Sequence, residues 1–207
     1  MSQLPELARF FTRVQALKRV PRSGWIDRGV SLPDVESVAD HTWQTALIAW
    51  LTAVDGSALD ANRVLQLAMI HDLAEVIVGD QPPYAADEVP DAGDRAALTA
   101  FFSRRQVRSE EARAVKREAE NAAFIDLIAD LSPTVRDLLT GLWEEYETQA
   151  TPEARFVKQA DTLEAYMQAL HYAAVDISLP MDGFRHMADL ELTQPEMVAI
   201  RDAVREQ

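Results

Sequence analysis

The sequence predicts an all-α protein that folds as a single domain. Apolar residues recur at helical spacing along most of the chain, and no segment shows the alternating apolar and polar pattern of a half-buried strand. Serine or threonine stands directly before proline at 132–133 and 151–152, which matches a helix start with an N-cap hydroxyl and a proline in the first turn. A length of 207 residues suits one domain with a sizeable core.

Loops rich in glycine and proline separate the expected helices. The predicted helices cover residues 7–17, 37–54, 62–78, 109–131, 133–146, 152–173 and the C-terminal tail 183–207. The third is apolar on almost every face, so we expect it to be the buried central helix. Gly79 ends it, and residues 80–94, with three prolines, are expected to form a surface loop or lid. The core should span about residues 17–173.

Three ionisable residues interrupt this third helix: His71, Asp72 and Glu75. On a continuous helix they lie at i, i+1 and i+4 and project from one side. Burying an unpaired carboxylate costs several kcal/mol, so this cluster needs compensation. A divalent cation would provide it, and imidazole with carboxylate ligands suits Mn, Fe, Co, Ni or Zn. The sequence therefore predicts a metal site on a buried helix.

A plainer explanation stays open, in which His71 and Asp72 hydrogen-bond backbone groups or an arginine in the core. Glu75 and Asp80 weigh against it, because they extend the acidic cluster on the same side. His41, near the start of the second helix, could lie beside His71 if the two helices are antiparallel. Asp40 or a backbone carbonyl could then orient a histidine ligand by accepting its second N–H.

Composition narrows the classes of function. The formal charge of −14 argues against binding to a nucleic-acid backbone, although nucleotides remain possible substrates. There is no cysteine, which excludes disulfides, thiolate metal sites and a cysteine nucleophile. The N-terminus has no apolar signal region, and the apolar runs are too short to span a membrane. We expect a soluble cytoplasmic protein with no nucleic-acid or membrane partner.

His41, the pair His71-Asp72 and the distant Asp161 resemble the H…HD…D signature of the HD-domain phosphohydrolase superfamily. The chain is more closely similar to its 5′-deoxynucleotidase branch, which includes a human-type protein. The stretches that carry this similarity, in family order, are LKRVPRSGW at 17–25, ESVADH at 36–41, HDLAEVIVGD at 71–80, LWEEYE at 142–147 and FVKQAD at 156–161. The resemblance implies a single HD-domain helical bundle over residues 1–207, built around a metal-binding helix.

The resemblance also implies a role for each matching residue. The ligands of one divalent metal ion (Mn, Co, Fe, Ni, Zn or Mg) would be His41, His71, Asp72 and Asp161. Glu75 would be the acid/base group. Asp80 would contribute to catalysis and lie with Trp25 against the sugar, where together they favour 2′-deoxyribose. The residues alone leave alternatives for two of these: Trp25 could plug the core, and Asp161 could sit on a solvated helix flank.

The phosphate-binding arginine directly precedes the tryptophan in the better-known bacterial members of the superfamily, but Gly24 stands there in this chain. The branch similarity implies that Arg22 or Arg19 takes the role. Glu145, in the Glu-Glu-Tyr-Glu run, is a further candidate for contact with substrate or metal shell. Such a charged run is also typical of a solvated helix face.

The implied reaction converts a 2′-deoxynucleoside 5′-monophosphate and water into the deoxynucleoside and phosphate, in a homodimeric enzyme. Alarmone hydrolases are a rival, but they follow this glutamate with aspartate, where this chain has Val76. Binuclear phosphodiesterases need more histidines, and dNTP triphosphohydrolases usually have longer chains. A rival of another class is a non-catalytic, metal-stabilised interaction protein; the complete set of candidate ligands, with Glu75, counts against it.

Overall fold

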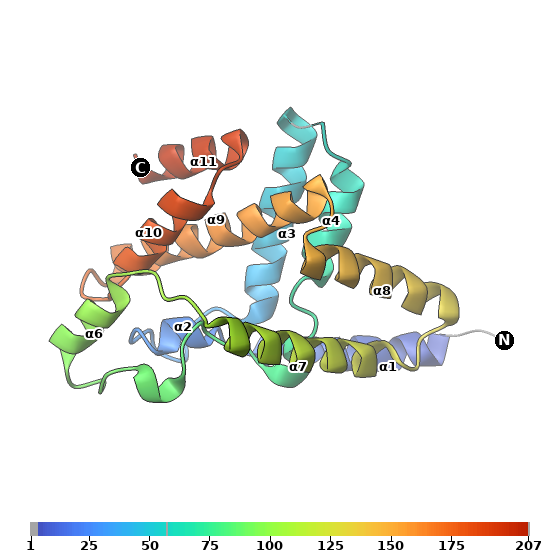
Figure 1. Ribbon diagram of the computed structural model, residues 1–207, viewed down its shortest axis with the longest axis horizontal. Coiled ribbons are helices and arrows are strands. Elements are labelled where there is room, and N and C mark those ends of the chain that lie inside the picture. The colour runs from blue at the N-terminus through green and yellow to red at the C-terminus, as the bar shows by residue number, and fades with distance from the viewer. Residues whose placement is uncertain (1–3, 57, 207) are drawn as a thin grey trace.

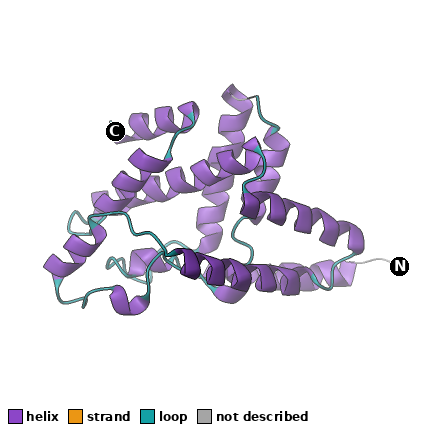
Figure 2. Cartoon of the chain, in the orientation of Figure 1, coloured by secondary structure: helices purple, strands orange, loops and turns teal. Residues whose placement is uncertain are grey.

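The computed structural model describes residues 4–56 and 58–206, and its regular structure is helical (Figures 1 and 2). Among these residues there is no strand, only an isolated bridge between Pro21 and Ser37. The α-helices are α1 Leu4–Val14, α2 Ser23–Ile26, α3 Val38–Gly56, α4 Ala61–Ile70, α5 Glu75–Val78, α6 Arg95–Phe102, α7 Glu110–Ile128, α8 Pro133–Thr148, α9 Pro152–Val175, α10 Asp182–Glu191 and α11 Pro195–Arg205. Short 3₁₀ helices cover Gln15–Arg19 and Ala86–Glu88. The all-α prediction is confirmed.

Local capping chemistry sets the start of the two long helices that follow α7. The Ser132 hydroxyl accepts a hydrogen bond from the backbone of Val135, and the Thr151 hydroxyl accepts one from Ala154. Proline follows each cap inside the first turn, as predicted. These starts fix the register of α9, the longest helix, and therefore the position of every polar residue along it.

The core is organised around α3 and α9. Figure 1 shows α9, in orange, lying across α3, and the two helices pack directly on each other and on α4. Buried alanines at 46, 49 and 53 of α3 and at 154 and 160 of α9 carry little bulk, which allows the two backbones to approach closely. The polar residues at 41 and 161 therefore come from two helices in direct contact.

The prediction of one continuous helix over 62–78 is wrong. Helix α4 ends at Ile70, residues 71–74 form turns, and α5 then runs for one turn. Hydrogen bonds join residues three apart here, from Leu73 N to Ile70 O (3.1 Å) and from Glu75 N to Asp72 O (3.1 Å). Such bonds tighten the chain relative to an α-helix. The three ionisable residues consequently do not lie along one helix face, and α3 and α9 are the central helices.

The segment that follows contains more structure than expected. Gly79 ends α5 with a φ of +74°, a conformation that favours glycine, so the predicted stop is confirmed. The expected loop over 80–94 includes a 3₁₀ turn and leads into α6, which the sequence analysis did not predict. The C-terminal tail forms α10 and α11. Within the described residues, no helix has the length and apolar character needed to cross a membrane.

Candidate metal centre

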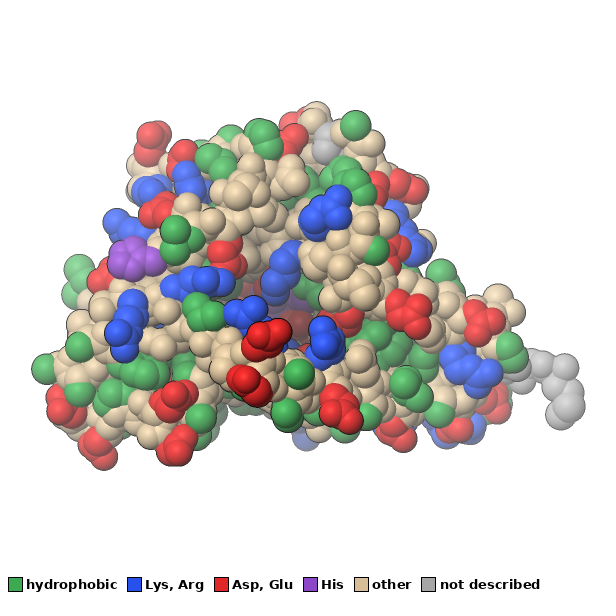
Figure 3. Space-filling view, viewed as in Figure 1, with side chains coloured by type: hydrophobic (Ala, Val, Ile, Leu, Met, Phe, Trp, Pro, Cys, Tyr) green, Lys and Arg blue, Asp and Glu red, His purple; other side chains and the backbone are tan. Residues whose placement is uncertain are grey.

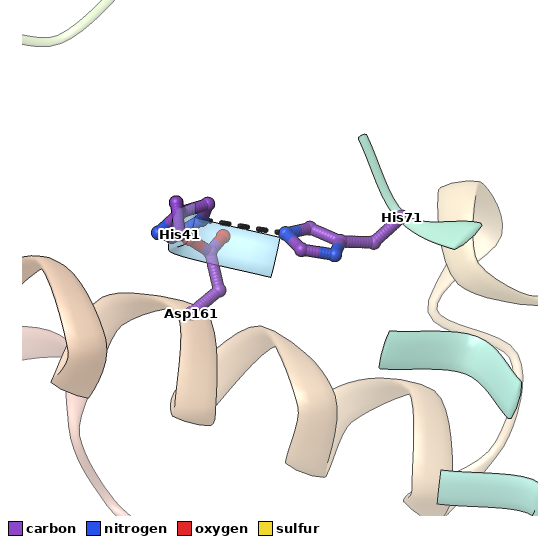
Figure 4. A group of neighbouring side chains, drawn as sticks. All are labelled: His41, His71 and Asp161. Atoms are coloured by element: carbon purple, nitrogen blue, oxygen red, sulfur yellow. Dashed lines mark hydrogen bonds and ion pairs between the residues drawn. The ribbon is translucent and has the colours of Figure 1, made fainter. Parts of the chain in front are cut away.

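Four side chains from three parts of the fold converge in the interior. His41 lies in the first turn of α3, His71 and Asp72 lie in the turn after α4, and Asp161 lies on α9. Figure 4 shows His41, His71 and Asp161 pointing toward one another. The His41 Nε2 atom is 3.4 Å from His71 Nε2 and 3.2 Å from Asp161 Oδ1. The Asp72 Oδ2 atom is 3.2 Å from His71 Nε2 and 3.6 Å from His41 Nε2.

The other nitrogen of each imidazole is held by an acceptor. His41 Nδ1 donates to the buried carboxylate of Glu164, and His71 Nδ1 donates to the Ala68 carbonyl at 2.7 Å. Each Nδ1 therefore has an acceptor for an N–H, and each Nε2 atom faces the centre, as metal ligation requires. A backbone carbonyl was one expected acceptor. Asp40, the other, is instead exposed and bonds Ser37, so that expectation is wrong.

These donor atoms fit a divalent cation. Nitrogen and oxygen ligands at about 2.1 Å from a metal lie about 3.0–3.5 Å from one another, close to the spacings here. The Asp72 Oδ2 atom is buried without a hydrogen-bond partner among the described residues, as expected of an atom whose partner is a cation. His41, His71 and Asp161 also meet a purely geometric criterion for a group that could hold a metal ion.

Charges around the centre keep two carboxylates ionised. Burial by itself would raise the pKa of Asp72, but His71, His41 and Arg22 together outweigh it and hold that pKa below its ordinary value. Burial opposes ionisation of Asp161 in the same way, and Lys158, 2.8 Å from its Oδ2 atom, lowers the pKa well below the usual range. Both side chains are therefore anions at neutral pH, the form that binds a cation.

Glu75 has the opposite character. Its side chain is 4% exposed, and its Oε2 atom is buried without a hydrogen-bond partner in the described part of the chain. Burial first, and then the charges of Asp72 and Asp80, raise the pKa of Glu75 well above its ordinary value. The carboxyl group thus keeps its proton to a higher pH than an ordinary glutamate does. A proton-holding carboxyl beside two ionised carboxylates is the usual arrangement of a general acid/base.

A cavity of about 290 Å³ opens beside the centre. Figure 3 shows this face of the molecule hollowed near its middle, with Lys and Arg side chains gathered around the hollow. Of the chain's 20 lysines and arginines, seven line the cavity: Arg22, Arg28, Arg104, Arg105, Arg108, Lys116 and Lys158. A protein with a net charge of −14 therefore concentrates positive charge at one opening, where it attracts anions.

Arg22 and Asp80 form one wall of this cavity. The Arg22 guanidinium lies 3.1 Å from Asp80 Oδ1 and 3.8 Å from Asp72 Oδ2. Asp80 is fixed further by the backbone N–H of Ser23, which donates to its Oδ2 atom at 2.6 Å. Arg19, the alternative phosphate-binding arginine, is exposed in the 3₁₀ helix after α1 and does not line the cavity. Of the two predicted arginines, the structure brings only Arg22 to the site.

The sequence left two placements open for Trp25, in the core or at the substrate site, and the structure combines them. It is 2% exposed and packs edge-to-face on Tyr172 in a second apolar cluster, yet it also lines the cavity. Its indole N–H donates to Glu36 at 2.7 Å. Burial, and then the charge of Glu164, raise the pKa of Glu36 to about 7. The sequence alone did not indicate Glu36 or Glu164 as part of the site. The only signal for Glu164 was that it follows Asp161 by one helical turn.

Glu145 does not reach the cavity. Its carboxylate pairs with Arg63 on α4 and accepts a hydrogen bond from the Thr151 hydroxyl at 2.6 Å. It therefore ties the end of α8 to α4 and to the start of α9. The geometry gives no support to a contact between Glu145 and substrate or metal.

The comparison with known families agrees with the four converging ligands. A family model described as the HD domain matches residues 14–178. The chain belongs to the HD-domain family. The predicted helical HD-domain fold is thereby confirmed.

Two curated relatives and one solved structure are similar to the chain over most of its length. It is 40% identical to the mouse 5′-deoxynucleotidase HDDC2 over 166 residues, which cover 80% of this chain and 69% of the mouse protein. It is 36% identical to the Xenopus laevis 5′-deoxynucleotidase HDDC2 over 203 residues, or 97% and 87% of the two chains. A conserved hypothetical protein from Pyrococcus furiosus superposes with a TM-score of 0.66 at 27% identity, covering 97% of this chain and 99% of that one.

Proposed function

We propose that this HD-domain protein is a metal-dependent 5′-deoxynucleotidase. It would hydrolyse 2′-deoxynucleoside 5′-monophosphates to the deoxynucleoside and phosphate. The observation that carries the proposal is the convergence of two imidazoles and two carboxylates beside the buried Glu75, at the wall of one basic cavity. The names of the mouse and Xenopus relatives support the same substrate class.

The metal ligands in this proposal are His41, His71, Asp72 and Asp161, which would hold one divalent cation (Mn, Co, Fe, Ni, Zn or Mg). Such a cation, when bound, neutralises phosphate charge and lowers the pKa of a coordinated water. The orientation of both imidazoles through their Nδ1 atoms supports the assignment, because it leaves both Nε2 atoms free to ligate. Asp72 Oδ2 contributes an oxygen that has no hydrogen-bond partner among the described residues.

Glu75 would act as the general acid and base of the reaction. Water attacks phosphorus, the bond from phosphorus to the 5′ oxygen breaks, and the leaving oxygen must gain a proton. A carboxyl with a raised pKa keeps its proton more readily than an ordinary glutamate and can donate it to that oxygen. The resulting carboxylate then takes a proton from the attacking water, which restores the starting state.

Two side chains along the cavity wall would position the rest of the substrate. Arg22 lies next to Asp72, so its guanidinium stands where a phosphate at the centre would need a cation. Asp80 would face the sugar, and Trp25 would lie against it where a 2′-hydroxyl finds no room. The hydrogen bonds from Ser23 and Arg22 to Asp80 support this role, since they fix its carboxylate.

A phosphate-release screen tests this proposal. Purified protein is supplied in turn with several divalent metals and with matched ribo- and deoxynucleoside monophosphates. We expect metal-dependent release that favours the deoxy series. Release from none of the deoxynucleoside monophosphates with any metal contradicts the enzymatic proposal and favours the non-catalytic interaction protein.

The proposed enzyme would act as a cytoplasmic homodimer without nucleic-acid partners. One face of α3 exposes an apolar stripe at helical spacing, made of Trp43, Leu47, Trp50, Leu51 and Val54. Trp43 alone is 64% exposed, and exposed apolar patches of this kind commonly mark interfaces. Sedimentation of the wild type and of Trp43→Glu tests the assignment: we expect a dimer that the substitution dissociates. A wild type that sediments as a monomer contradicts it.

A further inference from the structure

Arg28 is a buried cation at the wall of the cavity. It lies directly after α2, is 6% exposed, and stands between two aromatic rings. Its guanidinium carbon is 4.1 Å from the Phe102 ring centroid and 4.5 Å from that of Phe184. The aromatic rings hold the planar group in a defined orientation, which limits the directions in which its N–H groups can donate.

Several donors of this guanidinium are unused. Arg28 Nη1 donates to the Gly24 carbonyl at 2.7 Å and lies 3.4 Å from the Tyr84 hydroxyl oxygen. The Tyr84 hydroxyl itself donates to Asp27. Arg28 Nε is buried and has no hydrogen-bond partner among the described residues, and within the same residues no hydrogen bond from Nη2 occurs.

The charge of Arg28 is also unpaired. Arg22 and Arg105, which line the same cavity, pair with Asp80 and Glu191 respectively. Arg28 has no carboxylate within ion-pair distance in the described part of the chain. A buried cation without a partner is unfavourable, and the Nη2 group of Arg28, for which the described residues provide no hydrogen bond, can donate to an acceptor in the cavity. Arg28 is therefore a candidate contact for a ligand in this cavity.

The position of Arg28 defines which part of a nucleotide it would meet. Part of the cavity wall is formed by the metal-centre residues Asp72 and Asp161, together with Glu75. The remaining wall includes Arg28, beside aromatic rings that suit a flat base. Since the phosphate must lie at the metal centre, the base of a mononucleotide extends toward this aromatic wall.

We propose that Arg28 reads the base of the substrate, donating to its carbonyl oxygens, so that bases with a carbonyl are preferred over adenine. The inference rests on the proposed function and adds to it a specificity-determining residue. Guanine offers its O6 carbonyl as an acceptor, whereas adenine carries an amino donor in the same place.

The test compares three substrates: dGMP, dAMP and 2-deoxyribose 5-phosphate, which has the sugar and phosphate but no base. We expect wild-type kcat/KM to favour dGMP over dAMP by about tenfold, the order of one good arginine–guanine contact. In Arg28→Lys, which keeps the charge and loses the Nη2 donor, the ratio of kcat/KM for dGMP to that for 2-deoxyribose 5-phosphate should fall about tenfold. The fall should appear mainly in KM.

Arg201→Lys is the matched control, because Arg201 is nearly as buried and pairs with Asp189 and Asp202 outside the cavity. Its substrate ratios should equal those of the wild type. Equal losses on all three substrates in Arg28→Lys would mean that Arg28 supports the phosphate site or the fold, and would overturn the inference. A wild type without preference for dGMP would overturn it as well.

Failure of the proposed function is distinguishable from failure of this inference. If the wild type hydrolyses no nucleotide, binding of dGMP and dAMP to metal-loaded protein is measured by titration calorimetry. Tighter binding of dGMP that Arg28→Lys removes supports base reading without catalysis. Equal affinities for dGMP and dAMP, or none for either, overturn it.

Discussion

Glu164 accepts a hydrogen bond from His41 Nδ1 at a point where neither side chain is exposed to solvent. The bond joins α9 to α3 and fixes the orientation of the imidazole, so that its Nε2 atom points toward Asp161. Outer partners of this kind typically change metal affinity by about 10- to 100-fold. Glu164 therefore positions a proposed metal ligand without reaching the metal itself.

Replacing Glu164 should weaken metal binding. We expect Glu164→Ala to bind Mn²⁺ about 10- to 100-fold more weakly than the wild type in titration calorimetry. Glu164→Gln, whose amide oxygen can still accept from Nδ1, should lose less. Glu145→Gln is the control, since Glu145 pairs with Arg63 away from the centre. Unchanged affinity in Glu164→Ala would show that His41 needs no such support.

Glu36 should make the stability of the metal-free protein depend on pH. Folding raises the pKa of Glu36 from 4.5 to about 7, first through burial and then through Glu164. A raised pKa means that the folded state holds the proton more tightly. The stabilisation is therefore complete below about pH 4.5 and is lost as the pH rises through about 7.

Glu36→Gln stays neutral and can still accept from the Trp25 indole. We expect its Tm, relative to that of the wild type, to rise steadily between pH 4.5 and pH 8, since only the wild type must ionise a buried carboxyl there. Thermal unfolding of both proteins with a chelator present measures the difference. A difference in Tm that is constant across this pH range would contradict the prediction.

Two helical glycines should respond oppositely to alanine. A Cβ at Gly183 would lie 2.6 Å from the Phe102 carbonyl oxygen, which is backbone and cannot swing away, so Gly183→Ala should lower the free energy of unfolding by about 1–3 kcal/mol. Gly141 has no atom within 4 Å of such a Cβ, and alanine there should add up to about 1 kcal/mol. Urea unfolding of both variants checks the pair. A destabilised Gly141→Ala together with an unaffected Gly183→Ala would be inconsistent with this packing.

The sequence was sufficient for the helices whose boundaries depend on local chemistry. The caps at Ser132 and Thr151 involve neighbouring residues, so α8 and α9 could be predicted from a short stretch of chain. The break at His71 could not. It depends on i→i+3 hydrogen bonds and on the bond from the imidazole to Ala68, which leave no mark on the apolar pattern.

For the metal centre too, one part could be predicted from the sequence and another could not. The polar interruption at 71–75 could be recognised along the chain, whereas the meeting of His41 with Asp161 depends on the packing of α3 against α9. Glu164 and Arg28 were missed because a glutamate on a helix and an arginine in a loop usually face water. Only the fold shows that both are buried, one beside an imidazole and one between two rings.

Glu75→Ala tests the central claim most directly. Phosphate release from dAMP and binding of Mn²⁺ are measured on the wild type and on this variant under the same conditions. We expect the wild type to release phosphate only with metal, and the variant to bind the metal with near wild-type affinity while release is abolished. Undiminished release by metal-loaded Glu75→Ala, or release by wild type stripped of metal, would contradict the account.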